Sequence, residues 1–146
     1  NAQGLILMAA EESPGAHEPL ATVSRLLTRS LRTAREAGIP EGRIVLDPGI
    51  GFFRRVALSW ERWDCEVLRR LHEVAALGCP LLVGVSRKSF IGKILNRPDP
   101  ADRLAGSLAA TVVAVLHGAS AVRTHDVAAT CDAVRMAEAL RGEVRR

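Results

Sequence analysis

Short apolar runs alternate with longer amphipathic stretches along the chain. Three of the four runs are almost continuously apolar and partly β-branched, a pattern typical of strands that are buried on both faces. The fourth run is apolar at its start and polar at its end. We therefore expect four strands, at residues 4–8, 43–47, 80–85 and 121–125.

Apolar residues at helical spacing mark the stretches between and after these runs. The expected helices cover residues 22–37, 60–78, 104–118 and 128–140. Gly38 follows the first of them, where a residue that readily adopts the left-handed conformation ends a helix. Strands that alternate with helices predict a parallel α/β sheet with right-handed crossovers, which fits both a doubly wound sheet and a (β/α)8 barrel.

Polar residues cluster just beyond the carboxyl end of each expected strand, at residues 11–12, 47–49, 86–88 and 123–126. Barrel enzymes collect catalytic groups at that end of several successive strands, whereas a doubly wound sheet does so mainly at one switch point. The pattern therefore favours the TIM barrel.

Four β-α units in 146 residues are half of what this fold needs, because a full barrel has eight units and roughly 250 residues. We expect residues 1–146 to form one partial (β/α) barrel domain. Such a half barrel would expose two sheet edges and much of its core, which favours association. A small open sheet of four strands is the alternative.

Composition narrows the class of protein. Apolar residues make up 48% and charged residues 25% of the chain, as in a soluble globular domain. No apolar run reaches the roughly 18 residues of a membrane-spanning helix, and no signal peptide is recognisable, so we expect a cytoplasmic protein with no membrane partner. Three widely spaced cysteines, Cys65, Cys79 and Cys131, argue against disulfides and against a cysteine-based metal site.

The net charge of +4 raises the question of nucleic-acid binding. Proteins that bind single strands use exposed aromatic platforms, and this chain has only three Phe and two Trp. We therefore expect no nucleic-acid partner. The excess positive charge suits small anionic substrates instead.

The segment 46–52, Leu-Asp-Pro-Gly-Ile-Gly-Phe, places a carboxylate at the end of a buried strand. A carboxylate there is costly unless a partner binds it. The edge of a 2-amino-4-oxo-pyrimidine presents two parallel N–H donors, which the carboxylate of Asp47 can accept together. Gly49 and Gly51 permit a tight turn and a close approach to a ligand. The alternative is that Asp47 caps the following turn or pairs with an arginine.

A basic cluster follows the third expected strand, in the segment 84–92. If the strand continues, Gly84, Ser86 and Lys88 share one face because side chains alternate, and Lys88 reaches the mouth of the barrel. Arg87 then points the other way and ties neighbouring loops together. The alternative is a solvent-exposed basic turn. A P-loop is excluded, because the glycine spacing before the lysine is absent.

Arg123 and His125 follow the fourth expected strand and would share one face by the same alternation. An arginine and a histidine that project together from a strand end are suited to bind a phosphate or diphosphate. His125 as a metal ligand is the alternative, but no partner set at ligand spacing accompanies it.

The Asp-Pro-Gly-Ile-Gly-Phe, Ser-Arg-Lys-Ser and Arg-Thr-His-Asp segments, in this order, make the chain resemble the dihydropteroate synthases. The resemblance runs from about Leu5 to the last helix. It implies that the four strands are the last four of eight in a pterin-binding TIM barrel, its C-terminal half. It also implies a transferase of folate biosynthesis, which joins p-aminobenzoate to 7,8-dihydropterin-6-ylmethyl diphosphate and yields dihydropteroate and pyrophosphate.

The resemblance also implies a role for each motif residue. Asp47 would hold the pyrimidine edge of the pterin, and Lys88 would contact the pterin ring. Phe52 would lie beside the ring of p-aminobenzoate, and Ser89 would meet its carboxylate, chiefly through the backbone.

Arg123 and His125 would bind the diphosphate, so that the catalytic residues of the chain are Lys88, Arg123 and His125. The resemblance adds Mg²⁺, bound with the diphosphate, as a cofactor. No metal ligand is expected in this chain, because the family places that ligand in its N-terminal half. Full-length members are expected to be homodimers.

Two departures from the family pattern bear on activity. Phe53-Arg54 follows Gly-Phe where the family often has Gly-Lys, and nothing in the chain matches the family's N-terminal Asn-x-Thr-Pro-Asp-Ser-Phe loop. We therefore expect the chain alone to be inactive. Two alternatives remain: the pterin-binding domain of a corrinoid-dependent methyltransferase, and a non-catalytic half barrel that acts as a partner subunit.

Overall fold

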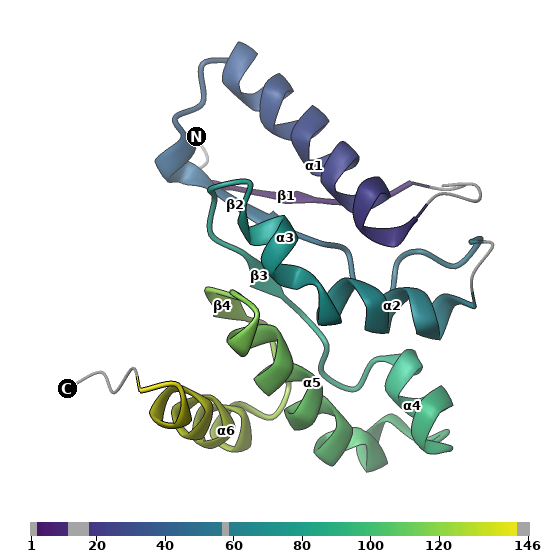
Figure 1. Ribbon diagram of the computed structural model, residues 1–146. Coiled ribbons are helices and arrows are strands. Elements are labelled where there is room, and N and C mark those ends of the chain that lie inside the picture. Colours follow the sequence, from purple (N-terminus) through teal and green to yellow (C-terminus); the bar gives the residue numbers. More distant parts are fainter. Residues whose placement is uncertain (1–2, 12–17, 57–58, 143–146) are drawn as a thin grey trace.

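Parallel strands and helices alternate along the chain in the computed structural model, which describes residues 3–11, 18–56 and 59–142 (Figure 1). Residue 12, in the first predicted polar cluster, lies outside the described residues. The elements are β1 (Leu5–Met8), α1 (Pro19–Glu36), β2 (Ile44–Asp47), α2 (Trp60–Arg69), α3 (Leu71–Ala75), β3 (Leu82–Val83), α4 (Ser89–Leu95), α5 (Leu104–Leu116), β4 (Ala121–Val122) and α6 (Val127–Leu140), with 3-10 turns at Glu41–Arg43 and Pro100–Arg103.

The described strands follow one another in space as they do in sequence. β1 pairs in parallel with β2, ending with Met8 opposite Asp47, and β3 pairs in parallel with β4. Between the two pairs, Leu46 forms a single parallel bridge with Leu81, and its N–H donates to the carbonyl of Pro80 at 2.9 Å. The parallel β-α arrangement predicted from the sequence is thus confirmed.

A continuous apolar core lies between the strands and the helices. α1 runs along β1 (Figure 1). Its Val23, Leu27 and Leu31 are buried in this core. Leu46 and Val83, from the two strand pairs, are fully buried in the same core. Apolar packing therefore joins the two pairs where the hydrogen-bonded ladder is thin.

Only one face of β1 is buried, contrary to the prediction. Leu5 and Leu7 are half-buried, whereas Ile6 and Met8 are 60% and 38% exposed. The pleat sends alternate residues to opposite faces, and in the described part of the chain α1 covers only one of them. β3 and β4 are also shorter than predicted, with two residues each.

The helices differ from the prediction in three ways. α1 begins three residues early, because Pro19 suits a first turn and the Glu18 side chain caps it by accepting the N–H of Ala21 at 2.8 Å. The helix predicted over 60–78 is broken at Arg70, whose φ of −113° and ψ of 24° are not helical. α4 was not predicted, since its seven residues are too few to establish a period.

Phe53 anchors the loop after β2 in the core. Its ring is 1% exposed and stacks on Trp63 of α2, with the centroids 5.1 Å apart. We expect Phe53→Ala to lower the free energy of unfolding by about 3–5 kcal/mol, because it removes a buried ring and leaves a cavity. Urea denaturation would measure the loss. Phe52→Ala is the control, since Phe52 is 49% exposed, and an equal loss in both variants would contradict the anchoring role of Phe53.

Candidate active site

Asp47 lies at the carboxyl end of β2 and is 9% exposed. Its Oδ1 accepts the N–H of Gly49 at 2.8 Å, so the turn-capping alternative is found in the structure. Oδ2 accepts no hydrogen bond within residues 3–11, 18–56 and 59–142. Each carboxylate oxygen has two lone pairs, so the turn does not exhaust the capacity of Asp47 to accept donors from a ligand.

Gly49 closes the turn against the end of β1. It has a left-handed φ of 73°, and a Cβ added to it would lie 2.0 Å from the carbonyl oxygen of Ala9. The N–H of Ala9 in turn donates to the carbonyl of Asp47 at 2.9 Å. The turn that presents Asp47 is therefore fixed by backbone contacts that leave no room for a side chain.

Lys88 is the residue before α4, and its side chain reaches the same end of the sheet. Its Nζ donates to the carbonyl of Ile50 and lies 4.6 Å from the centroid of the Phe52 ring. Burial lowers the pKa of the Lys88 ammonium below its ordinary value, and the carboxylates of Asp47 and Asp64 oppose this shift. The lysine is thus a partly desolvated cation next to the turn of Asp47, not an exposed basic residue.

The backbone conformation of Arg87 directs Lys88 to this end of the sheet. β3 ends at Val83, so strand alternation does not extend to Lys88, and the chain instead turns through a left-handed φ of 57° at Arg87. The Arg87 guanidinium binds the carboxylate of Asp126 through two hydrogen bonds, of 3.0 and 2.6 Å. This pair holds the pKa of the Asp126 carboxyl below its usual range. It joins the loop after β3 to the loop after β4, the tie between loops that the sequence predicted.

Arg123 and His125 lie with Lys88 around one cavity of about 300 Å³, whose lining is completed by Gly84, Ser86 and Thr124. The Oγ of Ser86 is 3.0 Å from Nδ1 of His125 and also accepts the backbone N–H of that residue at 3.2 Å. These residues lie beyond the ends of β3 and β4, so they do not share a strand face as predicted, but they line one cavity. Two cationic side chains and an imidazole around a small cavity are suited to bind a compact anion.

Ser89 contacts the part of the chain that departs from the family pattern. Its Oγ accepts a hydrogen bond from Nη2 of Arg54 at 2.7 Å, and the guanidinium of Arg54 lies 4.3 Å from the centroid of the Trp60 ring. The structure therefore accounts for Phe53-Arg54: Phe53 enters the core, and Arg54 links the loop after β2 to the start of α4. Phe52, between them, stays half-exposed beside Lys88.

Asp64 is a residue that the sequence analysis missed. It comes from α2, is 1% exposed, and its Oδ1 accepts the N–H of Gly51 at 2.8 Å. Its Oδ2 is buried without a partner in the described part of the chain. Burial raises the pKa of the Asp64 carboxyl from 3.8 to about 6. The signal in the sequence was a carboxylate at helical spacing between Trp60 and Val67, on the apolar stripe of the helix.

The raised pKa of Asp64 predicts how stability depends on pH. In the unfolded chain the carboxyl ionises near 3.8, whereas in the folded chain it stays protonated up to about 6, so stability falls as pH rises through this window. Asp64→Asn removes this loss. The variant should be more stable than the wild type above this window by up to about 3 kcal/mol and no more stable at its acid end. Urea denaturation at several pH values would measure this, and equal stabilities at alkaline pH would contradict it.

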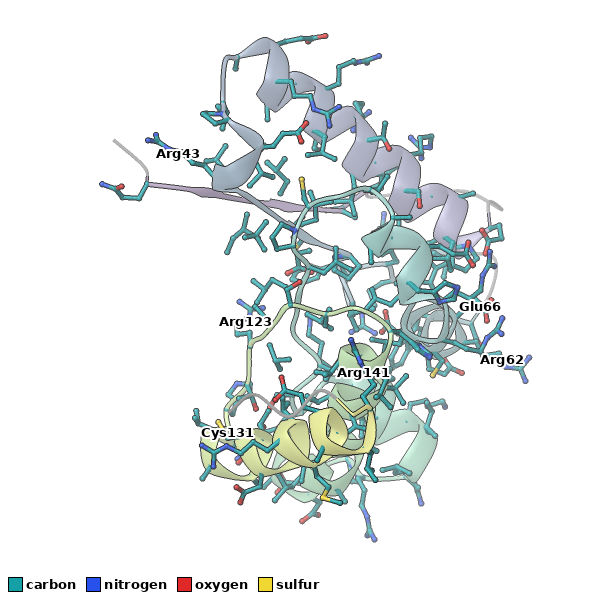
Figure 2. The ribbon with its side chains drawn as sticks, turned by 60° about the vertical axis from the view of Figure 1, so that its left-hand side comes forward. Arg43, Arg62, Glu66, Arg123, Cys131 and Arg141 are labelled. Atoms are coloured by element: carbon teal, nitrogen blue, oxygen red, sulfur yellow. The ribbon has the colours of Figure 1, made fainter. Side chains whose placement is uncertain are left out.

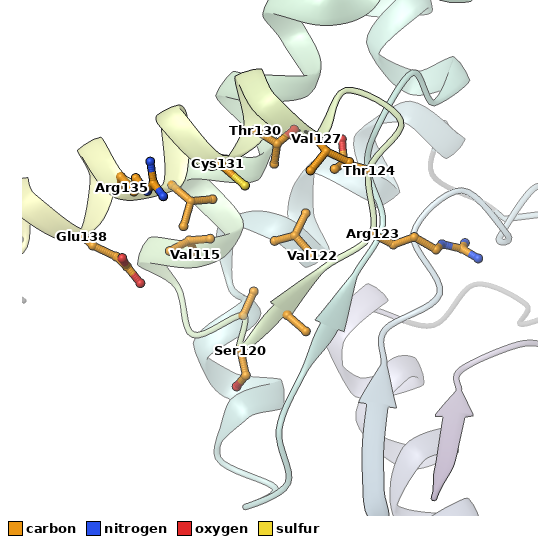
Figure 3. A pocket seen from close by; sticks show the side chains of 13 residues that line it. Val115, Ser120, Val122, Arg123, Thr124, Val127, Thr130, Cys131, Arg135 and Glu138 are labelled. Carbon is orange, nitrogen blue, oxygen red and sulfur yellow. Dashed lines mark hydrogen bonds between the residues drawn. The ribbon is translucent and has the colours of Figure 1, made fainter. Parts of the chain in front are cut away.

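A second cavity, of about 560 Å³, is not the site. It lies between β4 and α6 and is lined in large part by apolar side chains, such as Val115, Val122 and Val127 (Figure 3). Figure 3 shows the Arg123 side chain pointing away from it. In Figure 2, Arg123 stands on the side of the molecule opposite Glu66 of α2. The polar residues of the motifs therefore converge elsewhere, at the carboxyl ends of the strands.

Two further findings concern only the described residues. Within 3–11, 18–56 and 59–142, no three His, Cys, Asp or Glu side chains cluster as metal ligands would. No helix in these ranges is both long and apolar enough to span a membrane.

Known proteins that resemble this chain match it over the segments that carry the site residues. The family model described as pterin binding enzyme matches residues 3–125. The dihydropteroate synthase of Escherichia coli K12 is 40% identical over 129 residues, which cover 88% of this chain and 44% of that protein. The dihydropteroate synthase of Synechocystis is 47% identical over 107 residues, 73% of this chain and 35% of that protein. The chain thus spans less than half the length of these curated relatives.

Solved structures give the same result. A dihydropteroate synthase of Coxiella burnetii in complex with pteroic acid has a TM-score of 0.85 at 39% identity, covering 94% of this chain and 51% of that one. The Xanthomonas albilineans enzyme with 4-aminobenzoic acid has a TM-score of 0.85 at 35% identity, covering 94% and 49%. These likenesses confirm the predicted fold class, parallel β-α units of a TIM barrel, over part of such an enzyme.

Proposed function

The chain belongs to the family of pterin-binding enzymes, and on that premise we propose that its site serves the dihydropteroate synthase reaction. In this reaction p-aminobenzoate displaces diphosphate from 7,8-dihydropterin-6-ylmethyl diphosphate. One observation carries the proposal: the buried carboxylate of Asp47 at the end of β2 interacts electrostatically with Lys88, which lines a cationic cavity with Arg123 and His125. The substrate has the same two parts, a pyrimidine edge rich in donors and a diphosphate.

Asp47 would bind the pyrimidine edge. Its buried position means that water competes weakly for the carboxylate, and the turn through Gly49 fixes the direction of Oδ1 and Oδ2. Two parallel N–H donors from the ligand would then make charge-assisted hydrogen bonds. Lys88, held over the turn by the carbonyl of Ile50, would lie along the pterin ring.

Arg123 and His125 would bind the departing diphosphate. As the bond between the methylene carbon and oxygen breaks, negative charge develops on the leaving group and positive charge on the methylene carbon. Charges that already surround the cavity stabilise this separation without reorganisation, which is the largest contribution in many enzymes. Ser86 fixes the His125 ring through Nδ1 and leaves Nε2 for the anion. The arylamine is itself nucleophilic, so the step requires no strong general base.

Phe52 and Ser89 would border p-aminobenzoate. Phe52 is half-exposed next to Lys88, so its ring is accessible to an aromatic ligand. Ser89 lies at the start of α4, where its hydroxyl is bound by Arg54 and its backbone is the part left for a carboxylate. Arg54 adds a positive charge near that position.

Mg²⁺ does not fit the described residues as a protein-bound ion. It prefers carboxylate and phosphate oxygens, and the cavity is lined by Lys88, Arg123 and His125, while Arg87 occupies the carboxylate of Asp126. We propose that Mg²⁺ arrives with the diphosphate and that its protein ligand lies outside this chain. The homodimer that the family resemblance implies, and the cytoplasmic location expected from the sequence, belong to the same proposal.

The methyltransferase alternative explains less of the site. Pterin-dependent methyl transfer to a corrinoid handles no diphosphate, so it gives no reason for a cavity lined by Lys88, Arg123 and His125. Binding of pyrophosphate in this cavity would support the synthase reaction over methyl transfer.

The test separates binding from turnover. Saturation-transfer NMR with the 146-residue chain should show contact between the protein and the pterin ring of pteroic acid, and pyrophosphate should bind independently. Because the chain covers 44% of the E. coli relative, we expect no pyrophosphate release when both substrates are added. Absence of any pterin contact would refute the proposed function, and turnover by the chain alone would refute its expected inactivity.

A further inference from the structure

One peptide group in the turn after β2 is held from both ends by side chains of opposite charge. The carbonyl oxygen of Ile50 accepts a hydrogen bond from Nζ of Lys88, and the N–H of Gly51 donates to Oδ1 of Asp64 at 2.8 Å. These two atoms belong to the same planar unit. Rotation of this peptide would therefore break both contacts at once.

The two charges also act on each other. Asp64 comes from α2 and Lys88 precedes α4, and these helices pack together. The carboxylate of Asp64 favours the charged form of Lys88, and the ammonium of Lys88 favours the charged form of Asp64. The other charges that act on the pair are Arg54 on both members, and Asp47 and Arg123 on Lys88.

The hydrogen bond to Gly51 does not require a charge. Asparagine has the same shape and would accept the same N–H without the penalty of burying a carboxylate. Asp64 carries that penalty, since its second oxygen is buried without a partner in the described residues. A charge retained against such a penalty in a binding site points to a functional role.

We propose that Asp64 is a positioning residue: through the Ile50–Gly51 peptide and through its own charge, it keeps Lys88 protonated and fixed over the turn that presents Asp47. It touches no substrate. The role of Lys88 toward a pterin rests on the proposed function, whereas the coupling of Asp64 to Lys88 does not.

The chain allows a direct test, because its only two lysines are Lys88 and Lys93. Lysine labelled with ¹³C at Cε gives two NMR signals, and Lys93, exposed on α4, is an internal reference. We would follow both from about pH 5 to about pH 11 in the wild type and in Asp64→Asn. The pKa of Lys88 should fall by about one unit in the variant, as expected when a nearby opposite charge is removed, while that of Lys93 stays unchanged.

Glu61→Gln is the matched control, since it removes one negative charge from the same helix, one turn earlier. It should leave Lys88 unchanged. In the wild type alone, the Lys88 signal should also show a small step near pH 6, where Asp64 ionises, and the Lys93 signal should not. This second measurement uses only the wild type, so it remains possible even if Asp64→Asn does not fold.

Identical titrations of Lys88 in the wild type and Asp64→Asn, or a wild-type signal without the step, would overturn the coupling. Neither titration includes a ligand. Failure of pterin binding would therefore refute the proposed function without affecting the coupling of Asp64 to Lys88. With pteroic acid present, Asp64→Asn should weaken binding most at alkaline pH, where Lys88 loses its proton first. If Asp64→Asn weakened the binding of pteroic acid equally at every pH, Asp64 would have only a structural role, which would contradict the proposal.

Discussion

Gly49→Ala is expected to prevent stable folding. The added Cβ would lie 2.0 Å from the carbonyl oxygen of Ala9 and 3.3 Å from the Phe53 ring. The first contact is with backbone that is itself bound, because the N–H of Ala9 donates to the carbonyl of Asp47. Neither strand can move away without breaking this bond. We expect a loss of more than about 4 kcal/mol, a large part of the stability of an ordinary domain.

The matched control is Gly38→Ala. Gly38 has a φ of 74°, almost the same as the 73° of Gly49, but apart from its two chain neighbours no described residue has an atom within 4 Å of its added Cβ. It therefore carries only the penalty of a left-handed conformation, about 1–2 kcal/mol. Urea denaturation followed by circular dichroism would compare the two. Similar losses would show that the contact with Ala9 is unimportant and that the backbone conformation alone matters.

Asp47→Asn is expected to weaken binding of pteroic acid about a hundredfold or more, because two charge-assisted hydrogen bonds are lost. The amide oxygen can still accept the N–H of Gly49, so the turn should persist. The amide nitrogen, however, would present donors to the donors of the pyrimidine edge. Titration calorimetry would measure the change in affinity.

Two controls sharpen this result. Asp102→Asn removes the same charge from an exposed position in the turn Pro100–Arg103 and should leave the affinity unchanged. Pyrophosphate binding should survive in Asp47→Asn and fail in Arg123→Gln. If Asp47→Asn changed the affinity for pteroic acid less than about threefold, the pyrimidine edge would have to be held elsewhere.

Much of the fold could be read from the sequence because its signals are local. Buried apolar runs located all four strands, and helical spacing located the long helices, α5 within a residue or two of its bounds. What covers a strand is not a local property. The run at Leu5–Met8 is apolar throughout, but Ile6 is exposed because, among the described residues, α1 covers only the other face. α4 was not predicted because its seven residues make too few turns to show the helical period of apolar positions.

The site shows the same limit. Strand alternation placed Lys88 in the correct cavity for the wrong reason, since β3 ends at Val83 and the left-handed Arg87 redirects the chain. The partner of Arg87, Asp126, lies 39 residues away, and no local pattern identifies it. Asp64 was visible as a carboxylate on an apolar stripe, but only the folded chain shows that it meets Gly51.

The single bridge between β2 and β3 has a consequence for cooperativity. Asp47 belongs to the first strand pair, whereas Arg123 and His125 follow the second, so the site straddles the place where the ladder is thinnest. A ligand that reaches from Asp47 to Arg123 would cross-link the two strand pairs, so we expect it to suppress local opening at this junction. Hydrogen exchange of the Leu46 amide, which donates across this junction, would then report whether the site is occupied.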